Sequence, residues 1–268
     1  MKQQLTALIY HDVLQDSGLD DSGFQGRDAA SYKLVESRFR RHLDLIGDAI
    51  GPSAPLRIHG SGDLAQPPEG VALTFDDGGR SGVDRIAALL EERSWRAHFF
   101  ITTNFIDEPG FMSAADLRRL HAGGHVVGTH SASHPARISK LAISAILSEW
   151  HDSSARIADI IGAPVVTASV PGGFYSVEVA QMAAAAGVQV LFNSEPTRRV
   201  SRLGDVSVVG RFSITRRTSD AALTSLASGR RGAAVTQQLA WSGKKVLKQL
   251  GGEAWLRLRR TLFDLGAG

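Results

Sequence analysis

Short apolar segments rich in β-forming residues alternate with helix-like segments through most of this chain, and that alternation restricts its fold. Val71–Leu73 and Ala97–Ile101 are two of the apolar segments, and helices are predicted to follow them over 83–93 and 114–122. A sequence of this kind predicts parallel strands joined by helical crossovers. About seven such units favour a closed or nearly closed barrel over a doubly wound sheet, because no glycine-rich nucleotide fingerprint opens an early helix.

Two adjacent carboxylates, Asp76 and Asp77, follow the segment that ends at Phe75, and two glycines come after them. Neighbouring side chains in a strand point to opposite faces, so within a buried strand one of the two charges would be buried without reason. At the carboxyl end of the strand, where a turn begins, both can reach into one pocket. An ordinary Asp-Gly turn is the alternative for this motif taken alone.

Histidines also follow predicted strands. His11 ends the strand predicted over 6–11, and His130 ends the strand predicted over 125–130. Reacting groups gather at the carboxyl ends of the strands in parallel barrels, so we expect these histidines to share one site with the paired carboxylates.

A second imidazole, His134, comes four residues after His130. Side chains at this spacing share one face of a helical turn and can bind one cation. The chain has no cysteine, so any metal site has to use His, Asp or Glu. Two histidines and one carboxylate form a common three-ligand set that leaves positions open for water and substrate. The remaining carboxylate is then free to act as a base.

The composition is that of a globular protein with a sizeable core, with 268 residues of which 43% are hydrophobic and 21% charged. The apolar run Leu8–Tyr10 near the N-terminus is too short for a signal-peptide core or a membrane span. We therefore expect a cytoplasmic protein.

The C-terminal region is strongly basic and has a different pattern. We expect a barrel over 1–219 and a helical extension over 220–268, with helices over 221–249 and 253–264. Apolar positions such as Trp255 lie between basic ones, so the extension is expected to pack on the barrel or to contact an anionic membrane surface. A solvated basic face without a partner is the alternative, and nucleic acid is not expected.

Three motifs occur in an order that resembles the polysaccharide deacetylase family, the NodB-homology domains of carbohydrate esterase family 4 type. They are Thr74–Gly78, His130–His134 and Pro171–Gly173. The resemblance covers roughly residues 5–215; the first two motifs together are highly specific and the third is weak. It implies a distorted (β/α)7 barrel, here with a C-terminal helical appendix, and metal-dependent hydrolysis of N-acetyl groups on amino sugars.

The resemblance also implies roles for the residues in these motifs. Asp77, His130 and His134 would bind the metal, most often Zn²⁺. Asp76 would be the general base that takes a proton from a water whose pKa the cation has lowered. The turn at Pro171, Gly172 and Gly173 would bind the developing oxyanion, chiefly through the Gly172 N–H.

Two features depart from the family pattern. Many members have an Arg two residues before the motif proline to orient the base, but here that position is Ser169, and Arg211 is the predicted substitute. The usual late histidine that acts as general acid is also missing. The segment Ile9–Asp12 matches the strand that carries it, so the chain resembles a circularly permuted type in which His11 is the acid. A histidine that only caps a strand end is the alternative.

The predicted function is removal of N-acetyl groups from an amino sugar, a polysaccharide or its precursor, as in exopolysaccharide biosynthesis. One alternative is a hydrolase of small non-carbohydrate amides on the same scaffold. The other is a carbohydrate-binding protein that has lost catalysis, suggested by Ser169 and by the missing late histidine.

Overall fold

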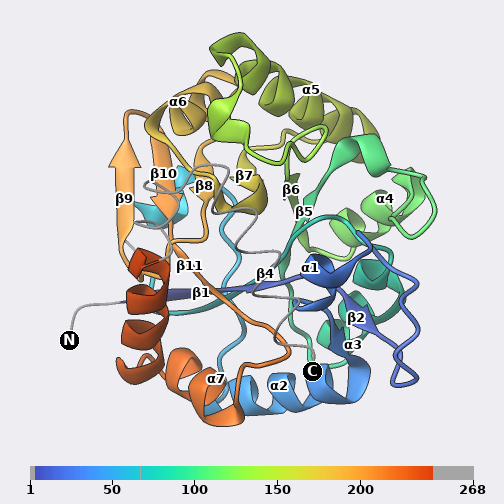
Figure 1. Ribbon diagram of the computed structural model, residues 1–268, viewed down its shortest axis with the longest axis vertical. Coiled ribbons are helices and arrows are strands. Elements are labelled where there is room, and N and C mark those ends of the chain that lie inside the picture. The colour runs from blue at the N-terminus through green and yellow to red at the C-terminus, as the bar shows by residue number, and fades with distance from the viewer. Residues whose placement is uncertain (1–3, 67, 244–268) are drawn as a thin grey trace.

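The computed structural model describes residues 4–66 and 68–243, which form a nine-stranded sheet and a small two-stranded one, with helices around them (Figure 1). This confirms the α/β class. The strands are β1 (Leu5–Tyr10), β2 (Val13–Leu14), β3 (Leu34–Val35), β4 (Gly70–Phe75), β5 (His98–Ile101), β6 (Val126–Thr129), β7 (Thr167–Ser169), β8 (Val190–Phe192), β9 (Val200–Leu203), β10 (Val206–Val209) and β11 (Arg211–Ser213). The helices are α1 (Arg27–Ala30), α2 (Glu36–Ile50), α3 (Ala88–Glu91), α4 (Ala114–Ala122), α5 (Ile143–Ile161), α6 (Val177–Ala185) and α7 (Asp220–Ala227).

The large sheet is parallel throughout except at one edge. Its order is β11-β1-β4-β5-β6-β7-β8-β10-β9, and only β9 runs antiparallel to its neighbour. The apolar pattern over 206–214 predicts one last strand, and this prediction is wrong. Gly210 separates β10 from β11. β10 pairs with β8 near one edge of the sheet, and β11 pairs with β1 at the other edge. A side chain at Gly210 would overlap Thr197, which explains why glycine stands at this break.

The register of the parallel ladders brings the carboxyl ends of several strands together. Tyr10 of β1 lies opposite Phe75 of β4, and Ile101 of β5 lies opposite Thr129 of β6. The residues that follow these strands therefore emerge at one edge of the sheet.

Apolar side chains fill both sides of the sheet. One buried cluster lies between the strands and the helices and includes Leu8, Phe39 and Leu73. A smaller one includes Ala7, Ala72 and Phe100, which are almost completely inaccessible to solvent. Because the sheet is covered on both faces, polar groups are confined to the strand ends or must be paired.

Two helices show how local sequence sets their ends. Ser113 caps α4: its side chain accepts from the Asp116 N–H, and the Asp116 side chain accepts from the Ser113 N–H. α5 ends at Ile161, with Gly162 (φ 69°) as its C-cap; the sequence pattern predicts a start at Ser139, but the helix begins at Ile143. A separate 3-10 turn occupies residues 138–140 instead.

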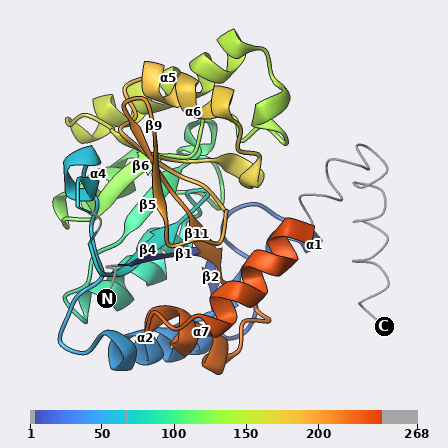
Figure 2. The same ribbon diagram turned by 90° about the vertical axis from the view of Figure 1, so that its left-hand side faces the viewer.

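The described part of the C-terminal region packs on the sheet domain. Leu223 and Leu226 of α7 join the main core, and Asp220 forms ion pairs with Arg38 and Arg41 of α2. α7 ends at Ala227 and a second helix covers 232–243, so the single helix predicted over 221–249 is interrupted (Figure 2). The boundary between 219 and 220 stays a prediction.

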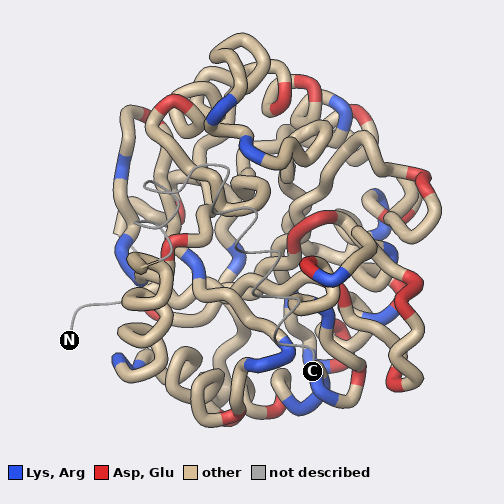
Figure 3. Tube along the Cα trace, viewed as in Figure 1, with Lys and Arg blue, Asp and Glu red and all other residues tan. Residues whose placement is uncertain are grey.

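The basic residues proposed for membrane contact fall largely on residues 244–268, outside the described part of the chain, as does the predicted helix over 253–264. Along the described trace, basic and acidic segments are intermixed (Figure 3). None of the described helices is long and apolar enough to cross a membrane.

Candidate active site

The two adjacent carboxylates are divided by the backbone at the end of β4. Ala72, Thr74 and Asp76 alternate along the strand, so they share its inner face. Asp77 comes next with φ 78°, a left-handed conformation that Asp tolerates better than most residues. The chain therefore turns at Asp77, and both carboxylates stay at the same edge of the sheet.

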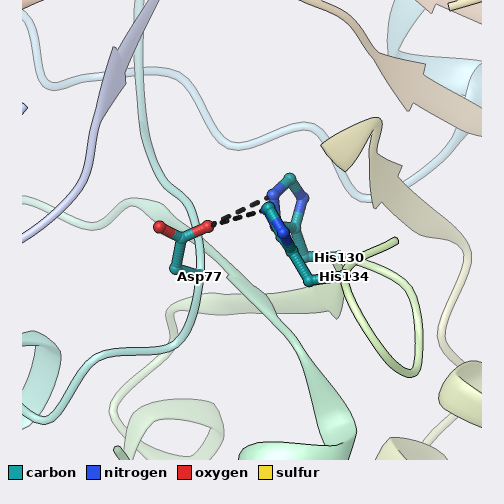
Figure 4. A group of neighbouring side chains, drawn as sticks. All are labelled: Asp77, His130 and His134. Atoms are coloured by element: carbon teal, nitrogen blue, oxygen red, sulfur yellow. Dashed lines mark ion pairs between the residues drawn. The ribbon is translucent and has the colours of Figure 1, made fainter. Parts of the chain in front are cut away.

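His130 and His134 converge on Asp77 (Figure 4). The Nε2 atoms of His130 and His134 lie 3.4 and 3.5 Å from Oδ1 of Asp77. The predicted helical turn is wrong, because Ser131 and His134 have φ of 70° and 53°. An irregular turn nonetheless brings the two imidazoles side by side, with ring centroids 5.1 Å apart and ring planes inclined at 50°.

These three residues fit a divalent cation. Their potential ligand atoms all lie within 4.8 Å of one another. The Nδ1 atom of His130 lies 2.9 Å from the Ser169 carbonyl oxygen and donates to it, which leaves Nε2 for a cation. Two imidazole nitrogens and one carboxylate oxygen are a donor set suited to Zn²⁺ and similar metals.

The charges around the cluster also suit a cation. Burial would raise the pKa of Asp77, but its hydrogen bond with His130 and the charges of neighbouring imidazoles hold that pKa well below its usual range. Burial alone would lower the pKa of His130, but the charges of Asp76 and Asp77 raise it. A cation needs neutral imidazoles, so its binding would displace a proton from this pair.

Asp76 is held by Arg211, the predicted substitute for the missing family arginine. Nη1 and Nη2 of Arg211 each lie 2.8 Å from one oxygen of Asp76. The other guanidinium N–H groups donate to Thr74 Oγ1, Ser169 Oγ and the Asn193 carbonyl. All five donors are thus satisfied although Arg211 is only 1% exposed.

Ser169 contributes to the same arrangement. Its hydroxyl donates to Oδ2 of Asp76 at 3.1 Å, while accepting from Arg211. Burial would raise the pKa of Asp76, but the charges of Arg211 and His130 outweigh it and lower that pKa. Asp76 is therefore ionised and fixed in orientation at neutral pH.

His11 follows β1 and lines a small cavity together with Asp76, Gly78 and Gly79. Its ring lies against Tyr32, with centroids 4.8 Å apart. The Nδ1 atom is buried and has no hydrogen-bond partner within the described residues. The neighbouring Asp76 N–H donates to the Tyr10 carbonyl at 3.0 Å, which ties the end of β1 to the end of β4.

The Pro171–Gly173 turn begins two residues after Ser169, the last residue of β7. Gly172 and Gly173 have φ of 59° and 70°, and a side chain at Gly173 would overlap Ser194. Glycine is therefore required at this turn by both conformation and space. The oxyanion role of the Gly172 N–H stays a prediction.

The sequence did not lead us to expect one further buried carboxylate at this edge of the sheet, that of Asp12. Asp12 is 4% exposed and lines the same cavity as His11. The signal was present, because Asp12 directly follows His11 at the end of a predicted strand, as Asp77 follows Asp76.

Part of the chain matches a family of known proteins. Residues 63–191 match the polysaccharide deacetylase family. Over 66 residues the chain is 35% identical to a chitin deacetylase of Colletotrichum lindemuthianum, a match that covers 24% of this chain and 27% of that protein. The chain therefore spans about a quarter of the length of this curated relative.

Solved structures share the fold. A polysaccharide deacetylase from Bacillus cereus superposes with a TM-score of 0.70 at 18% identity, covering 84% of this chain and 69% of the other. IcaB from Ammonifex degensii gives 0.67 at 20% identity, covering 84% and 97%. The family match includes Asp76, Asp77, His130 and His134, but it ends before Arg211 and begins after His11.

Proposed function

We propose that this chain, which carries a polysaccharide deacetylase domain over residues 63–191, hydrolyses the N-acetyl group of an amino sugar in a carbohydrate. The observation that carries the proposal is the convergence of Asp77, His130 and His134 beside the Arg211-held carboxylate of Asp76. A cation site next to a fixed, ionised base is what hydrolysis of an unactivated amide requires.

A divalent cation held by Asp77, His130 and His134, most simply Zn²⁺, would polarise the amide carbonyl and lower the pKa of water. Asp76 accepts the proton that the attacking water loses as its oxygen bonds to the acetyl carbon. Arg211 keeps both Asp76 oxygens directed and prevents the buried carboxylate from taking up a proton beforehand.

The leaving nitrogen needs a proton when the C–N bond breaks, and His11 is the donor in this proposal. It lines the same cavity as Asp76 but follows β1, whereas Asp76 follows β4, so acid and base come from separate elements. The Gly172 N–H is proposed to donate to the carbonyl oxygen as charge develops there. The products are acetate and a free amine.

The guanidinium of Arg211 speaks against one of the two grounds for the catalytically inactive alternative, because it contacts Asp76 where Ser169 offers only a hydroxyl. The choice between sugars and small non-carbohydrate amides depends on substrate tests.

The proposal is tested by screening N-acetylated oligosaccharides, nucleotide-linked sugars and lipid-linked sugars for released acetate. We expect release from at least one of these substrates, loss of release with a chelator and recovery on addition of Zn²⁺. Release only from small non-sugar amides would support the alternative hydrolase. A preparation that binds Zn²⁺ and releases no acetate from any substrate would contradict the proposal.

His11→Ala is expected to lower kcat by about 10²–10⁴-fold, because the leaving amine would depart without a positioned acid. Zn²⁺ affinity should change little, since His11 is not among the three converging ligands. Single-turnover acetate release and Zn²⁺ titration check the two expectations separately. Unchanged turnover in the variant would exclude His11 as the acid.

A further inference from the structure

Asp12 lies at the junction of two loops beside the proposed cation site. Its Oδ1 accepts hydrogen bonds from the hydroxyls of Ser22 and Ser81, at 2.5 and 2.8 Å. Ser22 belongs to the loop between β2 and α1, and Ser81 to the turn after β4. The two serines are also joined to each other, because the Ser81 N–H donates to Ser22 Oγ at 2.7 Å.

The carboxylate of Asp12 also occupies the space beside two glycines. A side chain at Gly23 or at Gly79 would overlap it. Gly79 closes the turn that begins with Asp76 and Asp77, so Asp12 packs directly against the segment that carries the proposed base and one proposed ligand. Lys33 secures the first loop from the other side, with Nζ 2.6 Å from the Ser22 carbonyl oxygen.

The charge of Asp12 is buried and only partly balanced. No cation forms an ion pair with it within residues 4–66 and 68–243, and the nearby Lys33 is paired with Asp20. Burial raises the pKa of Asp12, hydrogen bonds from both serines oppose that rise, and the charge of Asp77 adds to it. A buried negative charge packed against the turn that carries Asp77 would favour a cation bound at Asp77 and the two imidazoles.

We propose that Asp12 is a positioning residue for the cation site: it fixes the turn that carries Asp77 and strengthens cation binding through its charge. The inference rests on the proposed function only in taking Asp77, His130 and His134 as the ligands. Residues that do not bind a metal themselves often hold its ligands in place, and removing such a residue typically weakens metal affinity about 10–100-fold.

Asp12→Asn separates the charge from the packing. Both serines donate to the same oxygen, so the Asn carbonyl can accept both bonds while the amide nitrogen takes the place of Oδ2. We expect the variant to unfold at nearly the wild-type temperature but to bind Zn²⁺ about tenfold more weakly, as measured by competition with a chromophoric chelator.

Asp84→Asn is the matched control. Asp84 lies on the segment after the same turn, but its side chain is 43% exposed and paired with Arg80. The same loss of charge there should leave Zn²⁺ affinity unchanged. Wild-type affinity in Asp12→Asn, or an equal loss in Asp84→Asn, would overturn the inference.

The result is independent of turnover. Wild-type protein that binds Zn²⁺ but deacetylates no sugar would contradict the proposed function and leave the role of Asp12 standing.

Discussion

Replacing Asp76 with Asn is expected to lower kcat by about 10²–10⁴-fold, the usual contribution of a general base, while the protein still binds Zn²⁺. Asp76 lies outside the cluster of converging ligand atoms, and Arg211 occupies both of its oxygens. Asn retains an acceptor for one guanidinium N–H, so the base is removed with little change in packing. Acetate release and Zn²⁺ titration on the same preparation provide the measurement.

Asp77→Asn should instead lose Zn²⁺ affinity first, and lose activity as a consequence. The Oδ1 atom of Asp77 faces both imidazoles, so this variant removes the charge of a proposed metal ligand itself. Its loss of Zn²⁺ affinity is expected to exceed the roughly 10–100-fold typical of groups outside the ligand shell, and activity falls with it. Equal losses of affinity in the two variants would contradict the division of roles between the adjacent carboxylates.

The proposed ligands could be predicted from sequence because they follow apolar strands. Asp76 and Asp77 directly follow β4, and His130 directly follows β6, so a parallel arrangement alone is enough to bring them to one edge. His134 was predicted by spacing, yet its position depends on positive φ at Ser131 and His134, which helical periodicity does not encode. The prediction of proximity was right and the local conformation behind it was wrong.

Arg211 was harder to predict because its position depends on a strand break. With an uninterrupted strand over 206–214, Arg211 would lie beside β8, away from β1. The break at Gly210 moves β11 next to β1, where Ala7 pairs with Arg211. An isolated glycine in a strand pattern is a known sign of such a break, but it does not indicate the new partner strand. The surroundings of Asp12 were equally hard to predict, because its hydrogen-bond partners Ser22 and Ser81 come from two separate loops.

Arg211→Met is expected to reduce both stability and activity. It would leave the Asp76 carboxylate buried without its cation, and breaking a buried pair by removing one partner typically costs about 3–5 kcal/mol. The guanidinium also lowers the pKa of Asp76, so its removal raises that pKa and protonates more of the base. The acid limb of kcat/KM should therefore move to higher pH.

The pH dependence of the stability lost in Arg211→Met follows from the same lowered pKa of Asp76. In the wild type, the lowered pKa means that the Asp76–Arg211 pair stabilises the fold above the unfolded-state pKa and loses this contribution as pH falls through the folded-state pKa. In Arg211→Met the buried carboxylate is most costly at neutral pH, and protonation relieves it. The difference in unfolding free energy between the two proteins should thus shrink as the pH is lowered, which denaturant titrations at several pH values would measure.

Two further variants separate the charge of Arg211 from its packing. Arg198 also crosses between elements, donating to Thr6 Oγ1 and to the Leu226 carbonyl, but it pairs with no carboxylate among the described residues. Arg198→Met should lower stability without moving the acid limb. Adding Asp76→Asn to Arg211→Met should restore part of the lost stability, because no buried charge then remains unpaired, while activity stays lost. If the double variant is no more stable than Arg211→Met, the cost lies in the contacts of Arg211 with Ser169, Thr74 and Asn193, and the ion pair is not what holds Asp76.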